Sequence, residues 1–206
     1  MIVLDVNAGK ILVRRDFSYP LMLEAARRLA TLQLDPIVLG HNPDGLGRDV
    51  FYRHDALANS DFVGKNPTFS RKVEAWSELE GEHLVELILL GQQEPLEAAA
   101  ASLMGLDLEM AIIRNTYYRE YMLEITPKGV SKLLAARELA FHLGVSEAKI
   151  LAVGDSENDY ELLKHIPMSV AVANAAERAK AAAKEMTGSN AEGGVGQAIF
   201  RHLPTG

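Results

Sequence analysis

Hydrophobic and polar residues alternate with two different periods over the first 126 residues of the chain. Short apolar runs bounded by turn residues predict strands, and apolar positions three or four residues apart predict helices. Strands are predicted at 2–5, 10–14, 36–40, 49–53, 83–91, 109–115 and 120–126, and helices at 21–32, around Trp76 and at 95–105. Residues 55–70 look irregular. This succession predicts a compact α+β layer.

The pattern changes at Pro127, where helices and strands begin to alternate. Helices are predicted at 131–144, 155–166, 175–186 and 193–203, and strands at 149–154 and 169–174. The run KILAVG is almost continuously apolar, which is typical of a strand covered on both faces in a parallel sheet. Such alternation indicates a doubly wound sheet. The chain is therefore expected to be an α/β protein, with an α+β domain at 1–126 and part of a doubly wound parallel sheet at 127–206.

The composition of the chain excludes several classes of function. The formal net charge is −7 and no basic stripe occurs, so nucleic acid is not expected as a partner. The absence of cysteine excludes disulfides, thiolate zinc sites and cysteine nucleophiles. The first residues show no basic leader with a long apolar run, and no apolar stretch is long enough for a bilayer. A cytoplasmic protein with no membrane partner is the expectation.

A cluster of polar residues follows the strand at 149–154, where the chain turns into a helix: Asp155, Ser156, Glu157, Asn158 and Asp159. Ligands of open α/β sheets bind at the carboxyl ends of the strands. Three acidic side chains there repel one another unless a cation or hydrogen-bond donors balance them, and such oxygen ligands suit Mg²⁺. The structural alternative is that Asp155 or Ser156 caps the helix and Glu157 interacts with its dipole.

Two lysines, Lys128 and Lys132, lie at the start of the helix that precedes this strand. A positive charge at a helix N-terminus opposes the helix dipole, so a structural preference does not explain it. An ammonium group suits the anionic oxygens of a phosphate. Lys132 is the candidate phosphate ligand, and a solvated surface lysine is the alternative for either residue.

The stretch from Leu123 to about Val195 resembles the C-terminal part of the Cof-type phosphatases of the haloacid dehalogenase (HAD) superfamily, which carry a large C2-type cap. EITPKGVSK is similar to the third sequence motif of that superfamily and GDSENDYELL to the fourth. The segment SVAVANAAERAKAAAKEMTGSNAEGGVGQAI is similar to the tail of the family. One departure is Leu133, where the family usually has glycine.

The resemblance implies a role for each residue of these motifs. Asp155 would bind Mg²⁺, and Asp159 would bind it through water or stand behind the direct ligand. Lys132 would be catalytic and hold the phosphate, together with Asn158 and with Asn174 in a loop facing the site. Residues 1–126 would form the cap, so the incomplete HAD core would begin at residue 127.

The N-terminal motif of the family, D-x-D-G-T, has no counterpart in this sequence. Its first aspartate is the nucleophile and its second the general acid, and a Ser or Thr on another strand holds the phosphoryl group. The best substitute for the nucleophile is Asp5 in IVLDVNAG, but Asn7 cannot donate the proton that a leaving alkoxide needs. The segment reads better as the first hairpin of the cap, so the chain is expected to begin inside a longer gene.

These observations leave three functional hypotheses open. The first is a Mg²⁺-dependent phosphomonoesterase acting on small phosphorylated metabolites. The second is a non-catalytic remnant, and the third an esterase-type hydrolase that uses metal-bound water. Without the family's first strand, the strand ending at Gly154 would have an unpaired edge. A homo-oligomer, a rearranged N-terminus or a complementing chain is expected to cover that edge.

Overall fold

The computed structural model describes residues 2–5, 9–41, 48–53, 62–115 and 120–202. The chain divides into two compact units, Met1–Val130 and Ser131–Gly206, and each is described by itself. The division falls shortly after the boundary predicted at 126–127. No helix among the described residues is long and apolar enough to cross a membrane.

The first unit is built on a six-stranded sheet with the order β5-β4-β3-β6-β8-β7. Its strands pair antiparallel except β5, which runs parallel to β4. The strands are β3 (Ile37–His41), β4 (Arg48–Tyr52), β5 (Ser70–Lys72), β6 (Leu84–Gly91), β7 (Leu108–Asn115) and β8 (Glu120–Pro127). All but β5 were predicted from the apolar pattern, and β5 was missed because its three residues Ser-Arg-Lys carry no apolar signal.

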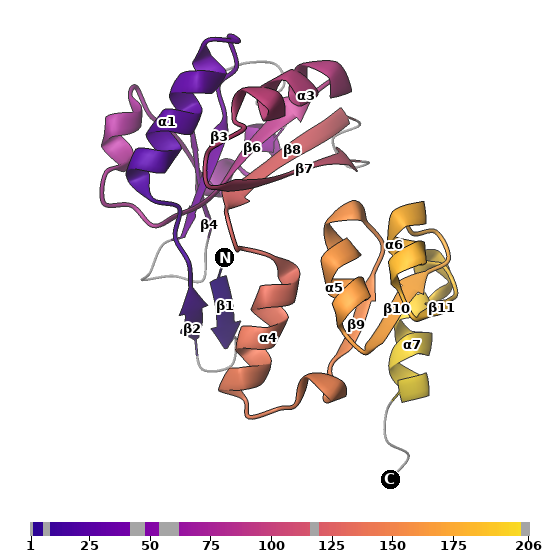
Figure 1. The fold of residues 1–206 in the computed structure, drawn as a ribbon. Coiled ribbons are helices and arrows are strands. Elements are labelled where there is room, and N and C mark those ends of the chain that lie inside the picture. The colour runs from indigo at the N-terminus through magenta and orange to yellow at the C-terminus, as the bar shows by residue number, and fades with distance from the viewer. Residues whose placement is uncertain (1, 6–8, 42–47, 54–61, 116–119, 203–206) are drawn as a thin grey trace. The chain divides into compact units, whose positions relative to one another are not determined.

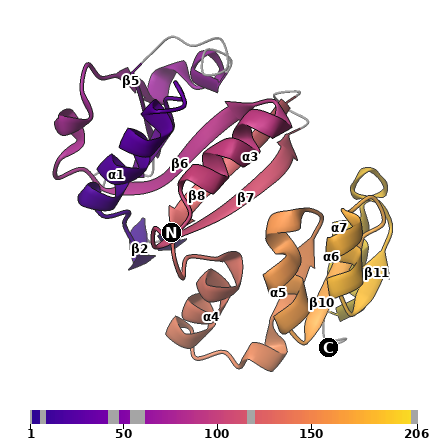
Figure 2. The same cartoon turned by 45° about the horizontal axis from the view of Figure 1, so that its top comes forward.

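Two helices, α1 (Tyr19–Ala30) and α3 (Gln93–Ser102), lie side by side over one face of this sheet, as Figures 1 and 2 show. Met22 and Leu29 of α1 and Leu96 of α3 are buried in one cluster with strand residues such as Leu87 and Leu123. Ile37, Leu39, Val50 and Ile88 form a separate buried cluster. Neighbouring strand residues enter different clusters because side chains alternate between the two faces of a sheet.

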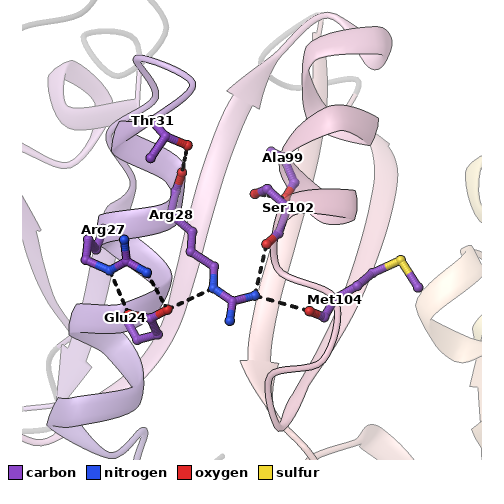
Figure 3. A network of polar contacts seen from close by, with 7 residues as sticks. All are labelled: Glu24, Arg27, Arg28, Thr31, Ala99, Ser102 and Met104. Atoms are coloured by element: carbon purple, nitrogen blue, oxygen red, sulfur yellow. Dashed lines mark hydrogen bonds and ion pairs between the residues drawn. The ribbon is translucent and has the colours of Figure 1, made fainter.

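Polar contacts also join α1 to the end of α3 (Figure 3). The guanidinium of Arg28 donates from Nε to Glu24 and from Nη1 to the backbone carbonyls of Ser102 and Met104, at 2.9, 3.1 and 3.1 Å. The last carbonyls of a helix have no partner within the helix, so Arg28 supplies donors where α3 ends. Arg27 binds the same Glu24 carboxylate through two hydrogen bonds of 2.8 Å.

The predicted N-terminal hairpin consists of β1 (Ile2–Asp5) and β2 (Lys10–Arg14), which form a two-stranded sheet of their own. A polar cluster joins the end of this hairpin to the start of β6. The Asp16 carboxylate accepts from His83 Nδ1 at 2.9 Å and pairs with Arg14 Nε at 3.2 Å.

The second unit contains a parallel three-stranded sheet, β11-β10-β9, with the bounds β9 (Leu151–Gly154), β10 (Met168–Val172) and β11 (Glu185–Thr187). The helices are α4 (Lys132–His142), α5 (Tyr160–His165), α6 (Glu177–Ala182) and α7 (Gly194–His202). Helices α5 and α6 pack together against the sheet, and α7 contacts all three strands (Figure 2). The predicted α/β class with a parallel sheet is confirmed.

Two sequence-based expectations for this unit are wrong. The helix predicted at 175–186 ends at Ala182, and Glu185–Thr187 forms β11 instead, because pairing with Val170–Val172 outweighs the helix propensity of the alanine-rich segment. Strand β9 is not covered on both faces, since Leu151 and Val153 are only partly buried. Within the described part of the chain, β9 is the edge strand of its sheet.

Candidate functional site

The predicted site residues of the second unit gather where β9 and β10 end. Strand β9 ends at Gly154 and leads into Asp155, Ser156 and a 3₁₀ turn at Glu157–Asp159. Strand β10 ends at Val172 and leads into the loop that holds Asn174. The backbone N–H of Ala176 in that loop donates to the carbonyl of Asp155 at 2.8 Å, which joins the two loops. The site therefore lies at the carboxyl edge of a parallel sheet, where ligands of this architecture bind.

The carboxylate of Asp159 points back into its own loop. Its Oδ2 accepts the backbone N–H groups of Asp155 and Ser156, at 2.9 and 3.0 Å. Gly154 leaves the space for this side chain, since a Cβ at that position would lie 2.7 Å from the Asp159 Cβ. Asp159 is consequently one of the few buried charged residues, with 4% of its surface exposed.

Lys132 reaches this carboxylate from the first residue of α4. The helix starts there because the hydroxyl of Ser131 accepts the backbone N–H of Leu134, at 3.1 Å. The ammonium donates to Asp159 Oδ1 at 2.6 Å and to Asn158 Oδ1 at 2.9 Å. Half of the Lys132 side chain is exposed, so the ammonium is both anchored to the loop and accessible from solvent.

The ionisation of Asp159 follows from these contacts. Burial disfavours its charged form, but the hydrogen bond from Lys132 and those from the N–H groups of Asp155 and Ser156 outweigh that cost. The pKa of Asp159 therefore lies below its ordinary value. The carboxylate is charged at neutral pH and attracts the Lys132 ammonium.

Asp155 is the member of the loop whose side chain is suited to a metal. It is exposed, whereas both oxygens of Asp159 already accept hydrogen bonds from the chain. Within the described residues, no three His, Asp or Glu side chains are grouped to hold an ion. Mg²⁺ commonly takes one or two protein carboxylates and completes its shell with water and substrate phosphate. Asp155 is therefore the carboxylate of this loop that could bind Mg²⁺ directly, with water and substrate as the other ligands.

Asn174 connects the loop after β10 to the loop after β11 through a hydrogen bond. Its Oδ1 accepts the backbone N–H of Asn190 at 2.9 Å. The amide oxygen is thereby oriented toward Asn190, and the nitrogen is the remaining polar group of the side chain. Asn174 belongs to the same edge of the sheet as Asp155, and its role in phosphate binding stays a prediction.

Lys128 and Asp5 lie in the first unit. Lys128 sits in an exposed turn after β8, where its N–H donates to the carbonyl of Asp107 and the N–H of Gly129 donates to Glu109. Of the two candidate lysines, it is Lys132 that contacts the acidic loop. Asp5 is the last residue of β1 and lies opposite Lys10 in the register of the hairpin. Its proposed role as nucleophile stays a prediction.

Sequence reasoning assigned no functional role to Ser156 and none to Gly154. Ser156 donates its hydroxyl within the loop, and Gly154 makes room for Asp159. The order Gly-Asp-Ser with an aspartate three residues after the serine is the signal that could have found them, because a turn of this length brings the last carboxylate back to the first N–H groups.

Comparison with known proteins places the chain in a family. Residues 2–199 match the model of the haloacid dehalogenase-like hydrolases. The chain belongs to that family. Superfamily membership, predicted from the two motifs around Lys132 and Asp155, is therefore confirmed.

Individual relatives show the extent of the similarity. A chloroplastic endoribonuclease YBEY from Arabidopsis thaliana is 47% identical over 81 residues, which cover 39% of this chain and 14% of that protein. The 5-amino-6-(5-phospho-D-ribitylamino)uracil phosphatase YitU from Bacillus subtilis is 26% identical over 123 residues, 60% of this chain and 46% of that protein. The chain thus spans about half the length, or less, of these relatives.

A solved structure shows the same HAD fold. The haloacid dehalogenase-like hydrolase from Bacteroides thetaiotaomicron superposes with a TM-score of 0.76 at 19% sequence identity. The match covers 98% of this chain and 73% of the other. At this identity the similarity establishes the architecture, and the chemistry has to be argued from the residues of the site.

Proposed function

We propose that this chain is a Mg²⁺-dependent phosphomonoesterase acting on small phosphorylated metabolites. One observation carries the proposal: the Lys132 ammonium is held by Asn158 and Asp159, in the loop that also contains the exposed Asp155. This arrangement presents a positive charge and a metal-binding carboxylate together at the carboxyl edge of a parallel sheet. A relative, YitU from Bacillus subtilis, carries the name of a 5-amino-6-(5-phospho-D-ribitylamino)uracil phosphatase.

Each residue has a distinct role in the proposed reaction. Asp155 holds Mg²⁺, which when bound neutralises charge on the phosphate. Lys132 binds the anionic oxygens and balances the negative charge of the loop. Asp159 keeps the ammonium in place and fixes the backbone of Asp155 and Ser156. Asn158 and Asn174 contribute to binding of the phosphoryl group.

The proposed nucleophile is a carboxylate, either Asp5 or an aspartate of another chain. A carboxylate oxygen forms a bond to phosphorus while the bond from phosphorus to the alkoxide breaks. The alkoxide then takes a proton, and water hydrolyses the aspartyl phosphate. In the sequence, Asn7 stands two residues after Asp5 and cannot donate this proton, so the non-catalytic and metal-activated-water hypotheses are kept as alternatives.

The deciding experiment is hydrolysis of p-nitrophenyl phosphate with and without Mg²⁺. We expect turnover in Mg²⁺, its loss in EDTA, and a decrease on the order of 100-fold or more in Asp155→Asn. Glu157→Gln is the matched control, since Glu157 is an acid of the same loop that pairs with Arg178 at 3.8 Å. Turnover that persists in Asp155→Asn would refute the proposal.

Three further outcomes separate the alternatives. A folded protein without any turnover would favour the non-catalytic remnant. Ester cleavage that survives Asp5→Ala but disappears on chelation would favour attack by metal-bound water. Loss of phosphatase activity in Asp5→Ala, with folding intact, would identify Asp5 as the nucleophile.

The outer edge of β9 motivates the proposed assembly. Unpaired strand edges attract further strands, and Leu151 and Val153 are only partly buried. We propose that a second copy of this chain, or a complementing chain, covers this edge, in a protein located in the cytoplasm. Light scattering after size-exclusion chromatography should give a mass above that of one chain, and a strictly monomeric protein would contradict the homo-oligomer.

A further inference from the structure

Arg178, in the first turn of α6, brings a second positive charge to the acidic loop. Its guanidinium Nη1 lies 3.8 Å from Oε2 of Glu157. Lys132 contacts the next two residues of the same loop, Asn158 and Asp159. Helix α5, which follows the loop, contacts both α4 and α6 and lies between them (Figure 2). The loop therefore has a cation on each side, one from α4 and one from α6.

The aromatic ring of Tyr160 holds this guanidinium in place. The Cζ atom of Arg178 is 4.2 Å from the centroid of the ring, which is a cation–π distance. Tyr160 is partly buried and packs against a cluster that includes Leu163 and Ala179, so the ring itself has a fixed position. An arginine that is already ordered loses less conformational freedom when an anion binds to it.

The guanidinium of Arg178 keeps donors for a further anion. It carries five N–H donors in a planar fork that matches two oxygens of a carboxylate or phosphate. The distance of 3.8 Å to Glu157 is that of an ion pair and too long for a hydrogen bond. In the part of the chain that the structure describes, the guanidinium makes no hydrogen bond, and 63% of the side chain is exposed. These donors are open to solvent beside the loop that contains Asp155.

We propose that Arg178 is a specificity-determining residue that binds a second anionic group of the substrate, a carboxylate or a further phosphate. This role rests on the proposed phosphatase function, in which Lys132 holds the phosphoryl group. The substrate class is then phosphomonoesters that carry a second acidic group. A ligand of this kind brings additional negative charge to a loop that is already acidic, and Arg178 compensates that charge.

Phosphonates test this proposal without requiring turnover, because hydrolysis of a phosphate ester does not cleave their carbon–phosphorus bond. Calorimetry on the full chain in Mg²⁺ compares carboxyalkyl phosphonates with alkyl phosphonates in which a methyl group replaces the carboxylate. Diphosphonates of the same lengths form a second arm. We expect the parent protein to bind the doubly acidic ligands of at least one arm about 10-fold more tightly than the alkyl phosphonates. The arm with the larger preference identifies the second group as a carboxylate or a phosphate.

Substitutions of Arg178 separate recognition of the second group from a structural role. Arg178→Gln should abolish the preference and leave the affinity for alkyl phosphonates unchanged, whereas Arg178→Lys, which keeps the charge without the fork, should retain part of it. Arg137→Gln is the control, since Arg137 is an exposed arginine of α4 that binds Glu147 through two hydrogen bonds of 2.9 Å. It should keep the full preference.

Two results would overturn the role of Arg178. One is a preference that is absent from the parent or survives in Arg178→Gln. The other is an equal loss of affinity for the singly and doubly acidic ligands in Arg178→Gln, which would assign the residue to the structure of the loop.

The same measurements distinguish this inference from the proposed function. Binding with the expected preference, but without hydrolysis of p-nitrophenyl phosphate, would refute the phosphatase and leave Arg178 as an anion-binding residue. Hydrolysis by a protein without the preference would refute the role of Arg178 and leave the phosphatase in place. A parent protein that binds none of the phosphonates would refute the role of Arg178 whether or not it hydrolyses the ester.

Discussion

Asp159 shows at the scale of single residues how a loop of like charges is made stable. Its carboxylate is buried, yet its pKa is lowered, because three donors from Lys132, Asp155 and Ser156 converge on it. The repulsion expected among the acids of this loop is thus relieved by hydrogen-bond donors from the chain itself. The sequence predicted the residue types at this site and the choice of Lys132, but it could not show which carboxylate turns inward, since that depends on space left by Gly154.

The substitution Gly154→Ala tests whether the Asp159 side chain needs the space beside Gly154. The added Cβ would lie 2.9 Å from both Cγ and Oδ2 of Asp159, so the side chain has to move and its hydrogen bonds weaken. We expect the free energy of unfolding to fall by about 1–3 kcal/mol in urea denaturation. Gly196→Ala is the control, since a Cβ there meets nothing within 4 Å in α7. A Gly154→Ala protein as stable as Gly196→Ala would contradict the close packing.

Lys132→Met tests the ion pair. Without the ammonium, the pKa of Asp159 should rise, and stability at pH 7 should fall by about 1 kcal/mol, reduced by the solvent exposure of the lysine. A lowered carboxyl pKa adds stability above the unfolded value near 3.9, and this stability disappears as the pH falls through the folded value. The two proteins should therefore converge in acid, whereas Lys128→Met should match the parent throughout.

The helices and strands show which elements could be predicted from the pattern of hydrophobic residues alone. The long amphipathic or apolar segments became α1, α3, β6 and the other main elements close to the predicted bounds. The elements that the pattern did not predict were the short strands β5 and β11. Strand β11 exists because Glu185–Thr187 pairs with β10, and that partner lies more than ten residues away in sequence. Local periodicity carries no information about such pairing.

Glu24 links α1 to α3 through Arg28, and its titration should be visible in the stability of the first unit. Hydrogen bonds from Arg27 and Arg28 lower the pKa of Glu24 to about 2. Glu24→Gln should lower the melting temperature by a few degrees at pH 7, and the difference should shrink as the pH falls toward 2, because the parent carboxyl becomes protonated as the pH passes through its folded pKa. Glu80→Gln, which changes an exposed acid, should leave the temperature unchanged.

The two units of the molecule are each formed from one continuous segment, joined between Val130 and Ser131. The turn just before this junction is exposed at Lys128 and Gly129 and is held by hydrogen bonds to Asp107 and Glu109. Limited trypsin digestion should cut early after Lys128 and give two fragments. Glu109→Ala removes one of these hydrogen bonds, so cleavage should be faster, as measured by intact mass over time. A first cut inside α1 or α4, which contain Arg27 and Arg137, would contradict this division.

The order of the units along the chain has a consequence for synthesis on the ribosome. All residues of the first unit have been translated before Ser131 and Lys132 are added. Domains commonly fold as they emerge. The segment that forms the sheet with α1 and α3 is thus made before the loops that follow β9 and β10. Lys132, Asp155 and Asn174 come together only when the last strands leave the ribosome.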